Sequence, residues 1–234
     1  MVTSDGWTRR DWLIASAAGA SALVLGSAPR AIAKEAGADD VPTNLTPAQA
    51  LQRLVDGNRR FAAGKARGPH RSLARVRETA PDQKPFAAVL ACADSRVPVE
   101  ILFDQGFGDL FVGRVAGNVA TSEQIASLEY AALQLGVKAV LVLGHSSCGA
   151  LKAAMAGQEV PGQISVLFDH IWPAVRAGGG DLAKVATENV RFQAATLAEG
   201  SPALGGLSKQ GKLQIAGGIY DLASGVVTPV PLGG

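Results

Sequence analysis

The chain has 234 residues, of which 47% are hydrophobic and 18% are charged, and its formal net charge is +2. This length and composition are those of one ordinary globular domain with a substantial core. The near-neutral charge, without a basic stripe interleaved with aromatic residues, excludes a nucleic-acid-binding protein.

The first 33 residues have the pattern of an export signal. The pair Arg9-Arg10 precedes an apolar run over 13–25, and the small-residue pattern 31–33 follows it. The run is shorter than the roughly 20 residues that a membrane span requires, which favours export over a membrane anchor. We therefore predict a twin-arginine signal over 1–33, cleaved after Ala33, a polar tether over 34–44, and a periplasmic or otherwise exported domain over 45–234. Such a protein meets the membrane only transiently, through its signal.

The remaining hydrophobic pattern predicts an α/β fold. A helix should begin with Thr46 as its N-cap and Pro47 at its first position. Two uninterrupted apolar runs, 86–91 and 139–143, are typical of strands that are buried on both faces of a parallel sheet. The other predicted elements are a strand at 110–115, helices at 122–135 (capped by Thr121 or Ser122), 166–177 and 182–197, and a last strand at 213–220 with a bulge or bend at Gly217-Gly218. The order implies right-handed βαβ units, and hence a mostly parallel central sheet flanked by helices.

Residues of metal-binding type follow both apolar strands. The first strand runs into Cys92-Ala-Asp94-Ser-Arg96, and the second into Gly-His145-Ser-Ser-Cys148-Gly. Ligands of open parallel sheets bind beyond the carboxyl ends of the strands, near the switch point of the strand order. Thiolates, imidazole and carboxylate are ligands of Zn²⁺. The sequence therefore predicts a zinc site at the carboxyl ends of two strands, built from Cys92, Asp94, His145 and Cys148.

A disulfide between Cys92 and Cys148, the only two cysteines, is the alternative in an exported protein. A disulfide would leave His145, Asp94 and Arg96 without a reason to gather at the same place. We therefore favour the metal site.

The two motifs together resemble the β-class carbonic anhydrases. Further stretches share the resemblance, namely 58–61, 103–106, 116–118, 127–130 and 217–221. It covers the chain from about residue 45 to the C-terminus.

The resemblance implies the activity and the site. One Zn²⁺ per chain would be held by Cys92, His145 and Cys148, with a water in the fourth position that zinc activates as hydroxide near neutral pH. The reaction would be the reversible hydration of CO₂ to bicarbonate and a proton. Asp94 would orient the hydroxide, and Arg96 would hold Asp94 in a bidentate pair.

The resemblance also implies a substrate pocket in a homodimer or higher homo-oligomer. Gln83 would donate its amide to an oxygen of CO₂ or bicarbonate, and Phe111 and Tyr130 would form an aromatic wall across a dimer interface. Gly149 would let the backbone approach the substrate. Family members that close the site by placing the Asp on zinc carry Trp where this chain has Val89, so a constitutively open site is expected here.

Two other functions are compatible with the same ligands. One is hydrolysis of CS₂ or COS on the same fold, and the other is a catalytically silent zinc-binding protein. The presence of Gln83, Asp94 and Arg96 argues against the silent protein, because a structural zinc site needs none of them.

Overall fold

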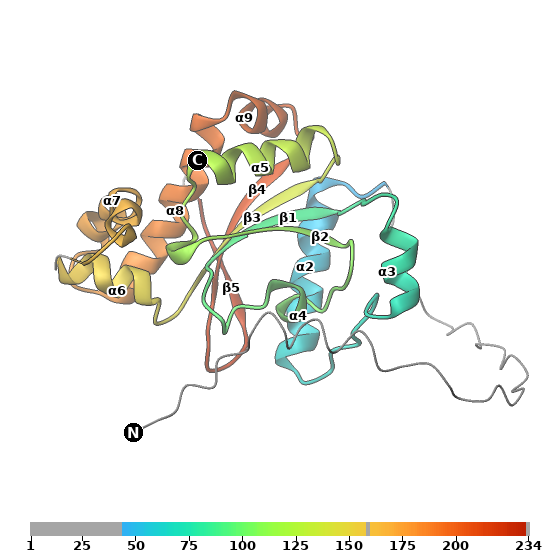
Figure 1. Ribbon diagram of the computed structural model, residues 1–234, viewed down its shortest axis with the longest axis horizontal. Coiled ribbons are helices and arrows are strands. Elements are labelled where there is room, and N and C mark those ends of the chain that lie inside the picture. Colours follow the sequence, from blue (N-terminus) through green and yellow to red (C-terminus); the bar gives the residue numbers. More distant parts are fainter. Residues whose placement is uncertain (1–43, 158–159, 233–234) are drawn as a thin grey trace, which may run out of the picture. The chain divides into compact units, whose positions relative to one another are not determined.

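The computed structural model describes residues 44–157 and 160–232. The predicted signal, and the predicted tether up to residue 43, lie outside the described residues. The described part contains a five-stranded sheet with strand order β2-β1-β3-β4-β5 (Figure 1). The first four strands in this order are parallel, and β5 is antiparallel to β4. The strands are β1 (Ala87–Ala91), β2 (Leu110–Arg114), β3 (Ala139–His145), β4 (Gln214–Tyr220) and β5 (Val227–Val230).

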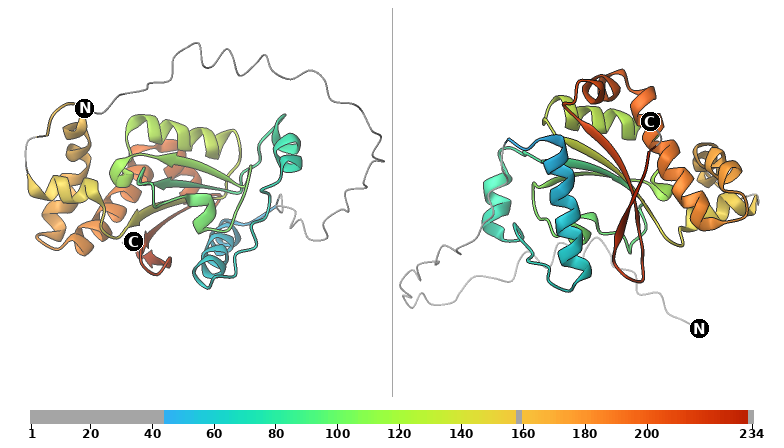
Figure 2. Two further views of the ribbon diagram at one scale, coloured as in Figure 1. Left: turned by 60° about the horizontal axis from the view of Figure 1, so that its bottom comes forward. Right: turned by 180° about the vertical axis from the view of Figure 1, so that it is seen from behind.

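Helices cover both faces of this sheet. Figure 2 shows α2 (Pro47–Ala62) and α5 (Ser122–Leu133) on opposite sides of it. On β1, Leu90 packs into the cluster that contains α5 residues, whereas its neighbour Val89 packs into the cluster that contains α2 residues. A strand with both faces buried needs apolar side chains in both directions, which explains the uninterrupted apolar run.

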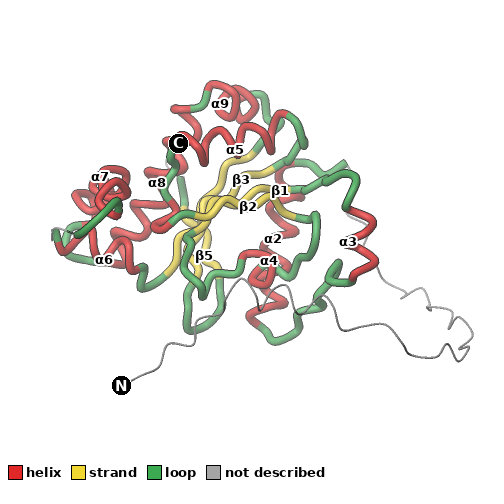
Figure 3. The backbone as a smooth tube through the Cα atoms, in the orientation of Figure 1, coloured by secondary structure: helices red, strands yellow, loops and turns green. Residues whose placement is uncertain are grey.

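The remaining elements surround the sheet, as the colouring of Figure 3 shows. They are α3 (Leu73–Thr79), α4 (Val99–Leu102), η1 (Ala116–Asn118), α6 (Gly149–Ala156), η2 (Ile164–Leu167), α7 (Phe168–Gly178), α8 (Leu182–Gly200) and α9 (Pro202–Lys209). None of the helices in the described ranges is long and apolar enough to cross a membrane.

The helix starts predicted from capping residues are confirmed. Thr46 accepts a hydrogen bond from the backbone N–H of Gln49, while the Gln49 side chain accepts one from the backbone N–H of Thr46. Thr121 caps α5 in a similar way, through the N–H of Gln124. The helix predicted from residue 166 begins at Phe168, because the residues before it form the 3₁₀ turn η2.

The prediction for the C-terminal strand was wrong in two respects. Gly217 and Gly218 lie in regular register with Val142 and Leu143, without a bulge or bend. A Cβ at Gly217 would lie 2.6 Å from a methyl of Val190, so this glycine lets α8 pack closely on the sheet. The strand is also not the last, because the short β5 follows it.

The chain order places a switch point between β1 and β3. From β1 the chain adds β2 on one side, and then returns to add β3 on the other side. Ala91 at the end of β1 pairs with Leu143 near the end of β3. The residues that follow these two positions therefore lie close together at the carboxyl ends of the strands, where open parallel sheets bind their ligands.

Candidate metal centre

Two strands and one helix terminus bring three ligand-type side chains together. Cys92 directly follows β1, and His145 is the last residue of β3. Ser147 then adopts a positive φ of 56° in the turn that leads to Cys148, the N-cap of α6. The ligand atoms of Cys92, His145 and Cys148 all lie within 4.8 Å of one another, and all three residues are buried. Both cysteines are free thiols, so the disulfide is not formed.

The imidazole of His145 is prepared to act as a ligand. Its Nδ1 lies 2.9 Å from the carbonyl oxygen of Ser146, which accepts the hydrogen bond when Nδ1 carries the proton. Nε2 then presents a lone pair, and this buried atom has no hydrogen-bond partner among the described residues. A buried polar atom without a partner is costly unless something binds it. Its position beside two sulfurs therefore fits a metal ion.

The thiol groups of Cys92 and Cys148 shift each other's pKa. Hydrogen bonding with the Cys148 thiol lowers the pKa of Cys92 to about 4, although burial acts in the opposite direction. The backbone N–H of Gly117 also donates to the Cys92 sulfur, at 3.3 Å. The pKa of Cys148 is correspondingly raised by the hydrogen bond with Cys92 and by burial. The cluster thus favours a thiolate at Cys92, which is the form that binds metals.

Asp94 lies beside the cluster and is held by Arg96. The guanidinium donates Nε–H to Oδ1 at 2.9 Å and Nη2–H to Oδ2 at 2.7 Å, and the backbone N–H of Arg96 adds a third hydrogen bond at 2.9 Å. The side-chain hydrogen bond from Arg96 holds the pKa of Asp94 well below its ordinary value. Oδ2 is 3.9 Å from Nε2 of His145. The structure therefore provides an ionised acceptor next to the cluster of Cys92, His145 and Cys148.

Arg114 was missed by the sequence analysis. It is the last residue of β2, and its Nε donates to the carbonyl oxygen of Cys92 at 3.0 Å while Nη2 donates to that of Asp94 at 2.5 Å. Arg114 thus fixes the backbone that carries the Cys92 and Asp94 side chains. The one sequence feature that could have indicated this role is the position of Arg114 near the carboxyl end of the predicted strand 110–115.

The predicted pocket residues are only partly brought together within one chain. Gly149 opens α6 directly after Cys148, and a Cβ there would meet no atom within 4 Å. Phe111 lies on the edge strand β2 and packs against Tyr130, with ring centroids 6.3 Å apart, and Tyr130 is half exposed.

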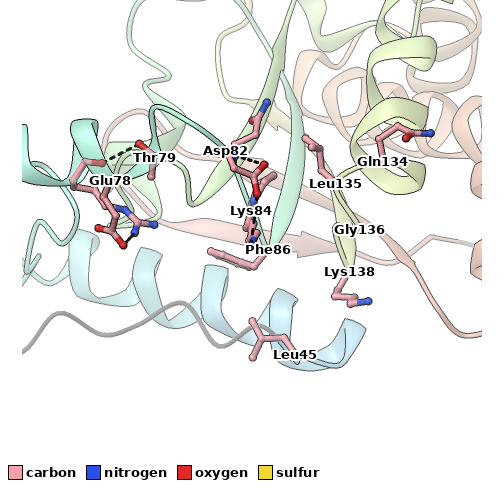
Figure 4. A pocket seen from close by; sticks show the side chains of 13 residues that line it. Leu45, Glu78, Thr79, Asp82, Lys84, Phe86, Gln134, Leu135, Gly136 and Lys138 are labelled. Carbon is pink, nitrogen blue, oxygen red and sulfur yellow. Dashed lines mark hydrogen bonds and ion pairs between the residues drawn. The ribbon is translucent and has the colours of Figure 1, made fainter.

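Gln83 lies near the amino ends of the parallel strands, whereas the metal cluster lies at their carboxyl ends. It precedes β1, whereas Cys92 follows it, and five strand residues span roughly 17 Å. Gln83 lines a cavity of about 780 Å³ whose other walls include Phe86 and Lys138 (Figure 4). Within a single chain it is therefore separated from the metal cluster.

Comparisons with known proteins agree on one family. A family profile described as carbonic anhydrase matches residues 87–227. Carbonic anhydrase 2 of Mycobacterium tuberculosis is 40% identical over 190 residues, which cover 78% of this chain and 92% of the relative. A carbonic anhydrase of Mycolicibacterium smegmatis is 38% identical, with 79% and 93% covered.

Solved structures agree as well. A Coccomyxa β-carbonic anhydrase, solved in complex with acetazolamide, superposes with a TM-score of 0.62 at 26% identity and covers 77% of this chain and 86% of that one. The β-carbonic anhydrase CcaA gives a TM-score of 0.61 at 27% identity, with 76% and 94% covered.

Proposed function

Because this chain belongs to the β-class carbonic anhydrases, and catalyses the reversible hydration of CO₂ to bicarbonate and a proton, we propose that Cys92, His145 and Cys148 bind one Zn²⁺ per chain. The observation that carries this proposal is the unpartnered Nε2 of His145 beside two buried sulfurs. One imidazole and two thiolates are a ligand set that Zn²⁺ accepts while keeping a fourth position open.

The protein side of the mechanism rests on Asp94 and Arg96. Zinc held by Cys92, His145 and Cys148 would supply a Lewis acid that makes water a stronger nucleophile near neutral pH. Asp94 remains ionised and accepts a hydrogen bond from the attacking water, so that a lone pair of the water points at the carbon of CO₂. Arg96 keeps the carboxylate in this orientation and off the open position of the metal, since it occupies both carboxylate oxygens.

The substrate pocket is proposed to be completed by a second copy of the chain. Gln83 lies too far from Cys92 within one chain to touch the same substrate, so an amide donor from Gln83 requires a homodimer or higher homo-oligomer. The half-exposed Tyr130 and its partner Phe111 lie at the sheet edge, where an aromatic wall across the interface is expected. The backbone of Gly149, unobstructed by a side chain, is the proposed approach for substrate beside Cys148.

The proposed location is outside the cytoplasmic membrane. The paired arginines, apolar run and cleavage pattern over 1–33 support export by the twin-arginine route. In this proposal the domain folds and binds its metal before export, so that both thiolates are protected from oxidation.

The proposed metal chemistry is tested by measuring zinc content and CO₂ hydration on the same preparation. We expect about one zinc per chain, loss of hydration when a chelator removes it, and recovery when Zn²⁺ is restored. Undiminished hydration by metal-free protein would overturn the proposal. Zinc without hydration would support the silent zinc-binding protein instead, and turnover of CS₂ or COS alone would support the hydrolase.

A further inference from the structure

The loop that follows β2 contacts a metal ligand directly. Gly117, in η1, adopts a positive φ of 76° and donates its backbone N–H to the Cys92 sulfur at 3.3 Å. A Cβ at this position would approach the side chain of Ile171 to 2.9 Å. Glycine is therefore required both by the backbone conformation and by the close contact with α7.

Two buried amides of α8 hold this loop in place. Asn189 and Gln193 are fully buried and lie one helical turn apart. Asn189 donates its Nδ2 to the carbonyl oxygen of Gly117 at 2.9 Å, and Gln193 accepts the backbone N–H of Ala120 on its Oε1 at 2.8 Å. Gln193 also donates to the Asn189 side chain at 3.1 Å and to the carbonyl oxygen of His170 at 2.9 Å. The loop, α8 and α7 thus share one connected hydrogen-bond network.

We propose that Asn189 and Gln193 are positioning residues of the metal centre, which act by aiming the Gly117 N–H at the sulfur of Cys92. The inference rests on the proposed zinc site. Gly117 is fixed from both sides, since its carbonyl is held by Asn189 and its N–H is committed to the ligand sulfur. The hydrogen bonds of these two α8 side chains within the described residues go to the loop, to α7 and to each other, and none goes to Cys92, His145 or Cys148.

The hydrogen bond from Gly117 acts on the negative charge of the Cys92 sulfur. A hydrogen bond to a thiolate stabilises the negative charge on the sulfur and restricts the direction in which its lone pairs point. Outer-shell hydrogen bonds of this kind typically change metal affinity 10–100-fold when they are removed. The network therefore tunes how strongly, and in which geometry, Cys92 holds the metal.

The competing explanation is that the two amides only stabilise the fold, since any buried amide that loses its partners destabilises a protein. A matched control separates the two. Asn58 of α2 is also buried and makes three hydrogen bonds to backbone groups, those of Leu102, Gly225 and Val227, on the other side of the sheet. None of these three hydrogen bonds involves the loop that contacts Cys92.

The experiment compares Asn189→Leu, Gln193→Met and Asn58→Leu in three measurements. These are thermal unfolding, Zn²⁺ affinity by competition with a chelator, and the sulfur-to-metal charge-transfer absorption of the Co²⁺-substituted protein. We expect all three variants to lose stability. Only the α8 variants should bind Zn²⁺ about 10–100-fold more weakly and shift the absorption band.

A milder variant keeps the test decisive if Asn189→Leu does not fold. Gln193→Met, already in the set, leaves the hydrogen bond from Asn189 to the Gly117 carbonyl in place, so a smaller change of the same sign is expected. Wild-type affinity and absorption in the folded α8 variants would overturn the inference, as would equal changes in Asn58→Leu. Failure of the unmodified protein to bind Zn²⁺ or Co²⁺ would instead refute the proposed metal site.

Discussion

The guanidinium of Arg96 occupies both carboxylate oxygens of Asp94, at 2.9 and 2.7 Å. The same carboxylate lies 3.9 Å from the unpartnered Nε2 of His145. An anion this close to a cation site needs a restraint if it is not to become a ligand. In the proposed mechanism this pairing orients Asp94 and keeps its carboxylate off the metal.

Arg96→Ala should abolish most CO₂ hydration while zinc remains bound. Without its partner, the Asp94 carboxylate is drawn by electrostatic attraction to the open position of the metal and blocks it. We expect a loss of about 10²-fold or more in kcat/KM at unchanged zinc content. Arg59→Ala is the control, because Arg59 forms only an exposed ion pair with Asp56 and should have no effect. Near-normal turnover in Arg96→Ala would assign Arg96 to the scaffold.

Asp94→Asn should also retain zinc, since Cys92, His145 and Cys148 remain. The amide removes the anionic acceptor that orients the attacking water. Loss of one preorganised hydrogen-bonding group typically costs about 10²–10³ in kcat, and we expect a decrease in this range. Metal analysis and stopped-flow hydration on one preparation check it, and loss of zinc from this variant would show that Asp94 is itself a ligand.

Cys148→Ser should release the metal and destabilise the protein. Structural zinc contributes about 10–16 kcal/mol in small peptides, and a neutral hydroxyl replaces a thiolate poorly. Zinc content and the unfolding midpoint are the measurements. In unmodified protein, thiol titration after denaturation and metal removal should find Cys92 and Cys148 both reduced. A disulfide in active enzyme would contradict the metal site.

Asp104→Asn should destabilise the fold in a pH-dependent way. Burial raises the pKa of Asp104, but hydrogen bonds from Arg60 and from the backbone N–H groups of Arg67 and Gly68 outweigh it, so that the pKa is lowered overall. Because the carboxyl pKa is lower in the folded state than in the unfolded state, the ionised Asp104 stabilises the fold at pH values above the ordinary carboxyl pKa of about 4. This stabilisation is lost as the pH falls through the folded-state pKa.

Unfolding free energies of both proteins measured across pH test this linkage. At pH 7 the variant should be less stable by about 3 kcal/mol, and the difference should shrink in acid. Asp56→Asn, which alters an exposed pair, is the control and should show almost no difference at either pH. A pH-independent deficit in Asp104→Asn would mean that packing, and not charge, is responsible.

Replacing Arg9 and Arg10 together by lysine should trap the precursor in the cytoplasm. A receptor reads the paired arginines as an address, and lysine does not reproduce their recognition geometry. The retained protein should still bind zinc and hydrate CO₂, because the proposed site lies outside the proposed signal. Fractionation with activity assays checks this, and normal processing of the double variant would point to another export route.

Several features could be predicted from local sequence because their causes are local. Thr46 and Pro47 mark a helix start through capping and a fixed φ, and the uninterrupted apolar run of β1 identifies a strand buried on both faces. The short strand β5 could not be predicted in this way, since its pairing with β4 depends on residues that are distant in sequence. Gly217 was misread for a similar reason, because the side chain that needs its missing Cβ is Val190 of α8.

The sequence by itself determined the family and singled out the proposed ligands and acceptor, since two short motifs at strand ends contain Cys92, Asp94, Arg96, His145 and Cys148. Tertiary structure alone decided what surrounds them. Three side chains from β2 and α8 form hydrogen bonds to backbone groups of the loops around the site, namely Arg114, Asn189 and Gln193. A hydrogen bond to a backbone group leaves no recognisable sequence motif, because every residue carries such groups. Tertiary structure also separated Gln83 from the cluster, because Gln83 precedes β1 and Cys92 follows it, so that the two residues lie at opposite ends of this strand.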